Sequence, residues 1–121
     1  LDEWNARRAK IAERYSNLLD VNLYSTPKIN KNANSAWHLY ELRTKSRDSL
    51  IKHLQDKNIS TLIHYPVPPH LQNAYKFLNL KKGRFKKAEI LSKELISIPI
   101  GPHLSEEDQN YIIESLNNFK S

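Results

Sequence analysis

The sequence predicts an α+β domain in which a small antiparallel or mixed sheet is covered by helices. Four segments place apolar residues at steps of three and four, as helices with one buried face do: 1–20, 47–57, 85–95 and 105–118. Three shorter runs rich in aromatic or β-branched residues favour strands: 36–44, 59–63 and 96–100. The chain of 121 residues is 39% hydrophobic and 26% charged, which indicates one globular domain, 1–121, with a modest core.

The N-terminal third predicts a helix, a connector and a strand. In segment 1–20 the residues Ile11, Tyr15 and Leu18 fall on one stripe, and no clear capping residue precedes the helix. Pro27 and the polar run that follows it resist regular structure, so 21–35 is expected to be a connector. The strand predicted over 36–44 alternates between two faces.

The middle of the chain predicts a helix, a strand and a stiff loop. Ser46 is expected to cap the helix over 47–57, with Leu50 and Leu54 facing inward. Three prolines within 64–69 fix φ and remove backbone donors, so this segment is an extended loop, followed by a helical turn near 71–75.

The C-terminal part predicts helix, strand and helix. Pro99, Gly101 and Pro102 end the apolar strand over 96–100. Ser105 with Asp108 three residues later resembles a capping box, and acidic residues suit the positive end of the helix over 105–118.

Composition excludes several classes of site. There is no cysteine, which excludes disulfides and thiolate metal sites, and two glycines cannot form a glycine-rich phosphate loop. No apolar stretch approaches the ~20 residues of a membrane span, and no signal peptide is visible, so we expect a cytoplasmic protein without membrane contact. The chain contains no methionine and begins at Leu1. We therefore expect it to be cut from a longer protein.

A basic run accounts for the net charge of +6. Six Lys or Arg residues and no acidic residue lie within 76–87. This pattern favours a solvated surface, and the alternative is a free-standing module that binds nucleic acid or an acidic partner. No nucleic-acid-binding motif accompanies the run.

The five histidines show no metal-ligand spacing, and no metal site is expected. His38 is expected to be a structural residue inside a strand, and His53 and His103 surface residues. Arg43 is expected to form a surface ion pair. No complete catalytic constellation is visible, so the residues identify no catalytic group.

The loop containing His64, Tyr65 and His70 is the strongest candidate site. Its prolines stiffen it, and imidazole and phenol groups can hydrogen-bond sugar hydroxyls or phosphate oxygens. The same residues also fit a loop that merely packs its prolines and Tyr65 over the helices. Residue chemistry alone does not separate these two interpretations.

Several segments in order resemble the C-terminal small domain of the DegT/DnrJ/StrS family of nucleotide-sugar aminotransferases. The resemblance covers nearly the whole chain, and its most specific segment is His64-Tyr65-Pro66-Val67-Pro68 with the HLQNAY run from His70 to Tyr75. Supporting segments are Asn5 to Tyr15, AWHLY from Ala36, and Ala88 to Asp108.

The resemblance implies the type I fold of pyridoxal-phosphate enzymes. Its members use pyridoxal phosphate, held by a large domain with a Schiff-base lysine, to transfer an amino group from glutamate to a nucleotide-linked keto sugar. They act as homodimers in amino-sugar and cell-surface polysaccharide biosynthesis. The resemblance implies that His64, Tyr65 and His70 lie near the sugar nucleotide. It also implies that this chain lacks the catalytic lysine, holds no cofactor and is inactive by itself.

Overall fold

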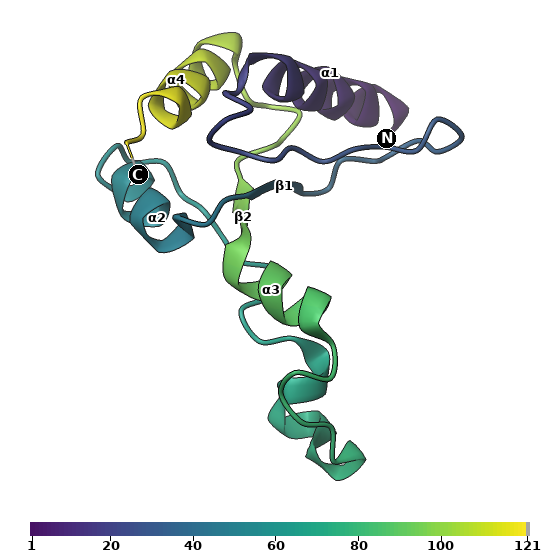
Figure 1. Cartoon of the computed structure of the whole chain (residues 1–121). Coiled ribbons are helices and arrows are strands. Elements are labelled where there is room, and N and C mark those ends of the chain that lie inside the picture. Colours follow the sequence, from purple (N-terminus) through teal and green to yellow (C-terminus); the bar gives the residue numbers. More distant parts are fainter. Residues whose placement is uncertain (121) are drawn as a thin grey trace.

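A computed structural model describes residues 1–120, and it has the α+β architecture that the sequence predicts. Three helices pack around a two-stranded sheet, while a second group of elements projects from this body as an arm (Figure 1). We define the arm as residues 64–94. The elements in chain order are α1 (Asp2–Leu18), β1 (Tyr40–Arg43), α2 (Arg47–Gln55), the 3₁₀ turns η1 (Pro69–Leu71) and η2 (Asn73–Leu78), α3 (Lys86–Glu94), β2 (Leu95–Ile98) and α4 (Glu106–Asn117).

The sheet is antiparallel, with Tyr40 opposite Ile98 and Glu41 opposite Ser97. Alternate residues of both strands face the core, as the period of two in a strand requires. A third segment joins through a single bridge, in which Leu62 lies opposite Ser97. The strand expected over 59–63 is therefore reduced to this bridge.

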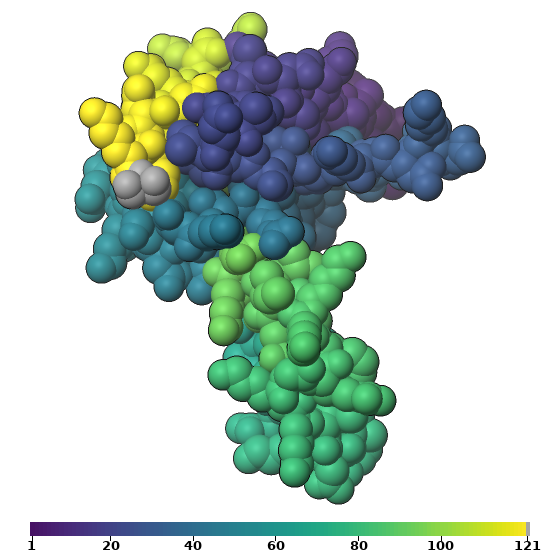
Figure 2. All heavy atoms as spheres, in the orientation of Figure 1, coloured from purple at the N-terminus to yellow at the C-terminus, as the bar shows by residue number. Residues whose placement is uncertain are grey.

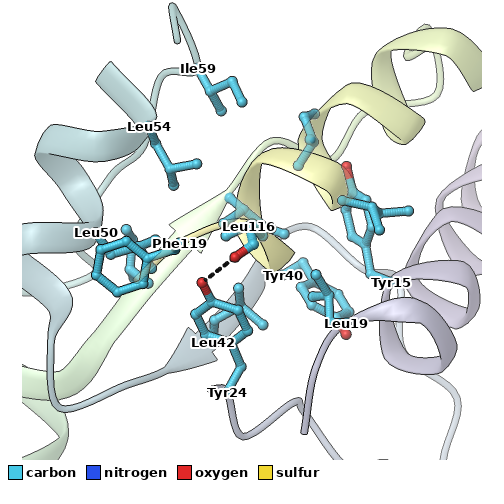
Figure 3. Packing of buried hydrophobic residues seen from close by; sticks show 14 of the residues in the cluster. Tyr15, Leu19, Tyr24, Tyr40, Leu42, Leu50, Leu54, Ile59, Leu116 and Phe119 are labelled. Carbon is cyan, nitrogen blue, oxygen red and sulfur yellow. Dashed lines mark hydrogen bonds between the residues drawn. The ribbon is translucent and has the colours of Figure 1, made fainter. Parts of the chain in front are cut away.

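The core lies between the sheet and helices α1, α2 and α4 (Figure 3). Two buried tyrosines extend across it and satisfy backbone carbonyls at the far side. The Tyr24 hydroxyl donates to Leu116 O at 2.8 Å, and the Tyr15 hydroxyl donates to Pro99 O at 2.9 Å. Burial raises the pKa of both phenols above the ordinary value, so they remain neutral donors. The largest fully buried side chains are Tyr15, Tyr40, Leu42, Leu50, Leu54, Ile96 and Leu116.

The helix caps agree only in part with the sequence prediction. Ser105 and Asp108 form the expected capping box at the start of α4, where the Ser105 hydroxyl accepts from Asp108 N at 3.0 Å. Ser46 does occupy the N-cap position of α2, but its side chain makes no capping hydrogen bond. The prediction for Ser46 was therefore right in position and wrong in mechanism.

Two histidine predictions are wrong. The strand begins at Tyr40 rather than at 36, after Trp37 with a φ of 50°, so His38 lies outside it and is exposed. His53 is half-buried: its Nε2 lies 2.8 Å from Ser115 O, and its ring packs edge-on against Phe119. Only tertiary packing reveals this, because the partners come from α4 and the C-terminus. His103 is exposed, as expected.

The arm contrasts with the body in its packing. Figure 2 shows it as a narrow lobe that projects away from the rest of the molecule. Within 64–94, Pro68 is the one residue that is buried as a whole. Large apolar side chains are exposed along it: Tyr65, Val67, Tyr75, Phe77, Leu78, Phe85 and Ile90. No helix among residues 1–120 is long and apolar enough to cross a membrane.

Candidate functional site

The candidate loop begins at the edge of the sheet. Leu62 and Ser97 exchange two backbone hydrogen bonds, in which Leu62 N donates to Ser97 O at 3.1 Å and Ser97 N donates to Leu62 O at 2.8 Å. This pair holds the chain beside β2 two residues before His64. The prolines that follow exclude further ladder bonding, so the chain leaves the sheet and enters the arm.

His64 lies at the root of the arm and is half-buried. Its Nδ1 is 2.8 Å from the Ser97 hydroxyl oxygen, and that oxygen is 3.5 Å from Glu41 Oε1. The peptide bond between His64 and Tyr65 is cis. The two rings meet edge to face, with their centroids 5.5 Å apart. One nitrogen of the imidazole is thus held by the sheet.

Tyr65 points its ring into solvent and is 70% exposed. A phenol in this setting can both donate and accept hydrogen bonds. Together with the adjacent imidazole, it forms a small polar-aromatic surface at the root of the arm. Such a surface suits the stacking and hydrogen bonding of a polar ligand.

His70 lies inside the arm rather than on its surface. Its Nε2 is 2.9 Å from Glu89 Oε1, and the two side chains are 6% and 12% exposed. Glu89 also accepts from the backbone N–H of Gly83 at 2.7 Å. The hydrogen bond with His70, supported by the N–H groups of Gly83 and Phe85, lowers the pKa of Glu89 below its ordinary value.

These contacts connect η1 to α3 and brace the arm internally. Gly83 has a φ of 91°, a conformation that favours glycine, and this conformation directs its N–H toward the Glu89 carboxylate. The Phe85 ring packs edge-on against His70 with the centroids 4.9 Å apart. The structure therefore brings His64 and Tyr65 together and places His70 in a separate cluster.

Three residues of these clusters escaped the sequence analysis: Glu41, Ser97 and Glu89. Ser97 carried a visible signal, because it is the one small polar residue in the apolar run over 96–100. Glu41 and Glu89 carried none, since surface carboxylates are common on strands and helices. Their partners lie 56 and 19 residues away in the chain, respectively.

The other predicted groups lie away from this loop. The six basic residues of 76–87 are all exposed on the arm, as a solvated surface would be. Arg43 forms the expected ion pair, with Glu94. A cavity of about 560 Å³ is lined by Tyr24, Arg43 and Glu94 among others, and not by any residue of the loop 64–70. No group of three or more metal-ligating side chains occurs in the described part of the chain.

Comparison with protein families gives one consistent result. The model of the DegT/DnrJ/EryC1/StrS aminotransferase family matches residues 1–117. A relative in Saccharopolyspora erythraea, the erythromycin biosynthesis sensory transduction protein EryC1, is 49% identical over 117 residues, which are 96% of this chain and 32% of the relative. The dTDP-3-amino-3,4,6-trideoxy-alpha-D-glucose transaminase of Streptomyces venezuelae is 37% identical over 98% of this chain and 32% of its own.

Solved structures lead to the same group. The crystal structure of DesV from Streptomyces venezuelae superimposes with a TM-score of 0.91 at 37% identity, covering 96% of this chain and 32% of DesV. An aminotransferase from Brucella abortus superimposes with a TM-score of 0.85 at 34% identity, covering 93% of this chain and 30% of its own. The present chain thus spans about a third of the length of the proteins that it matches.

Proposed function

Because the chain belongs to the DegT/DnrJ/EryC1/StrS aminotransferase family, we propose that it is the C-terminal domain of a longer, cytoplasmic sugar aminotransferase. The complete enzyme would transfer an amino group from glutamate to a keto sugar linked to a nucleotide. The observation that carries this proposal is the family match over residues 1–117, supported by relatives whose names describe dTDP-amino-sugar transaminases.

We propose that pyridoxal phosphate is held by another part of the enzyme. This cofactor supplies the amino-group chemistry when bound, and it requires a lysine amine in a desolvated pocket. Among residues 1–120 the lysine side chains are exposed or, at Lys57, half-buried. The described residues therefore do not fit the cofactor, and no step of the reaction is assigned to them.

The role that we propose for this chain is to complete the substrate cleft. His64 and Tyr65 would contact the sugar nucleotide directly, because Tyr65 is 70% exposed at the root of the arm and the half-buried His64 ring lies against it. His70 belongs to the same loop, but Glu89 already holds its Nε2. We expect His70 to act on the substrate by bracing the arm, with Nδ1 as its remaining polar atom.

The exposed apolar side chains of the arm fit a homodimer of the complete enzyme. Isolated soluble domains rarely display so many large apolar groups on one projecting segment. We propose that the remainder of the enzyme and its partner subunit cover the arm when the dimer forms.

The reading frame that precedes Leu1 provides the first test. It should encode about 250 further residues, including a lysine in a strand-helix domain, as the family resemblance and the size of enzyme domains imply. The purified full-length protein should then transfer an amino group from glutamate to a dTDP- or UDP-linked keto sugar in the presence of pyridoxal phosphate. A stop codon directly upstream, or a full-length protein that binds pyridoxal phosphate but aminates no keto sugar nucleotide, would refute the proposal.

His64→Ala in the full-length enzyme tests the site. We expect the KM for the sugar nucleotide to rise about tenfold, because the loss of a hydrogen bond to a polar ligand costs about 1–1.5 kcal/mol. The matched control is His103→Ala, since His103 is an exposed turn residue outside this loop. Equal kinetics for both variants would remove His64 from the site.

A further inference from the structure

Three polar side chains form a chain of contacts on the sheet face that points away from the core. Glu41 and Ser97 lie directly opposite each other on β1 and β2, and His64 follows the segment that bridges to Ser97. The Ser97 hydroxyl oxygen is 2.8 Å from His64 Nδ1 and 3.5 Å from Glu41 Oε1. Ser97 is only 5% exposed, so its hydroxyl has little access to water.

The chemistry of these groups limits which atom can donate. A carboxylate can only accept, and a serine hydroxyl has one proton to give. When that proton points to Glu41, the Ser97 oxygen offers a lone pair to His64. The Nδ1 atom of His64 must then carry a proton and donate it in a hydrogen bond to the Ser97 oxygen. The contact of 3.5 Å is longer than an ordinary O–H···O hydrogen bond, and the charge of the Glu41 carboxylate attracts the Ser97 proton across it.

We propose that Ser97 and Glu41 are positioning residues that hold neutral His64 in the tautomer with its proton on Nδ1. The Nε2 atom is then a hydrogen-bond acceptor. A free imidazole in water prefers the opposite tautomer, with the proton on Nε2. The sheet thus sets the hydrogen-bonding character of the loop, as outer partners do for metal-bound histidines.

This arrangement selects a class of ligand group. An unprotonated Nε2 accepts from a hydroxyl or an amine, and it repels the lone pairs of a carbonyl or phosphate oxygen. If the proposed function is right, His64 therefore recognises a hydroxyl of the sugar ring rather than its keto oxygen or the diphosphate. Only the identity of the ligand rests on the proposed function, because the tautomer follows from this chain alone.

Nitrogen-15 NMR of the histidine rings in the 121-residue chain tests the tautomer directly. We expect the ratio of Nδ1-protonated to Nε2-protonated neutral His64 in the unmodified chain to exceed that of a free histidine by about fivefold or more, which corresponds to one net hydrogen bond. In Glu41→Ala the Ser97 hydroxyl is free to donate to Nδ1, so we expect the proton to move to Nε2. A merely structural role for Glu41 would not move the proton.

Variants at Ser97 test the other partner of His64. Ser97→Thr keeps a hydroxyl and should retain the proton on Nδ1, whereas Ser97→Ala should lose the preference. Ser92→Ala is the control, because the Ser92 hydroxyl donates to Glu89 O within α3 and does not touch His64. A proton on Nε2 in the unmodified chain, or an unchanged tautomer in Glu41→Ala, would overturn the proposal. Should Ser97→Ala fail to fold, Glu41→Ala and Ser97→Thr still decide it.

Kinetics of the full-length enzyme separate the two proposals. If amino transfer is observed, Glu41→Ala should raise the KM for the sugar nucleotide severalfold and leave the KM for glutamate unchanged. An active enzyme with the wrong tautomer contradicts the positioning role while the proposed function stands. The right tautomer in a full-length protein without transaminase activity contradicts the proposed function and leaves the positioning role intact.

Discussion

Replacing Phe77 or Phe119 by alanine removes the same atoms from two different surroundings. Phe119 is 6% exposed and packs in the body against His53, whereas Phe77 is 73% exposed on the arm. Replacing a completely buried phenylalanine by alanine lowers the free energy of unfolding by about 3–5 kcal/mol. We therefore expect Phe119→Ala to lower the free energy of unfolding of the chain by about 3 kcal/mol.

The cost at Phe77 follows from its burial. About a quarter of its surface is covered in the chain, so Phe77→Ala should cost at most about 1 kcal/mol there. In the complete enzyme the same substitution should behave like the one at Phe119, because we expect the arm to be covered when the homodimer forms. The loss would then appear as a weaker dimer, by about 2–3 kcal/mol per subunit.

Urea titration of the 121-residue chain and sedimentation equilibrium of the complete enzyme measure these two effects. Tyr111→Ala is a useful control, since Tyr111 is half-exposed on α4, outside the arm. Equal destabilisation of the isolated chain by Phe77→Ala and Phe119→Ala would contradict the difference in burial. A complete enzyme whose stability and association are both unchanged by Phe77→Ala would contradict the covering of the arm.

Three further predictions concern single interactions. Tyr24→Phe should lower the free energy of unfolding, measured by urea titration, by about 1 kcal/mol, because Leu116 O loses the phenol donor but keeps the Phe119 N–H. A loss above ~3 kcal/mol would contradict the assignment of a single hydrogen bond to the hydroxyl. Ser105→Ala should cost about 1 kcal/mol by removing the capping box of α4, whereas Ser46→Ala should be near neutral because Ser46 makes no capping bond; equal costs would contradict the assignment. The lowered pKa of Glu89 means that its ionised form stabilises the arm above its ordinary pKa of 4.5 and that this stabilisation is lost as the pH falls through the lowered value. Hydrogen exchange at the Gly83 amide should therefore lose protection in acid, and Glu89→Gln should abolish that pH dependence; protection that is equal at all pH values would refute the role of the carboxylate.

The order of helices was predictable because their signals are local. The stripe through Ile11 and Tyr15, and the capping box of Ser105 and Asp108, act over three or four residues, and both occur in the structure. Leu18, which the periodicity predicts to continue the stripe, is 49% exposed at the end of α1. The family was also predictable, because the HYPVP segment and its neighbours form a specific ordered pattern that the family comparison confirms.

The extent of the strands was less predictable. The run over 36–44 reads as one strand, but pairing with β2 covers only Tyr40–Arg43. The run over 59–63 forms a single bridge, in which Leu62 pairs with Ser97 of β2. The prolines that follow prevent further pairing and direct the chain away from the sheet. A strand exists only where a partner is available, and sequence patterns do not reveal the partner.

For the residues of the candidate loop, the sequence identified the group and the structure identified the partners. From the sequence alone, His64, Tyr65 and His70 form one group on a stiff loop with an undecided role. The structure separates them, since His64 joins Ser97 across 33 residues and His70 joins Glu89 across 19. The sequence by itself determined the family, the helices and the position of the loop, because these depend on local periodicity and residue chemistry. Only the tertiary structure decided which polar atoms of the loop are held within the chain, because hydrogen bonds between distant residues depend on how the chain packs.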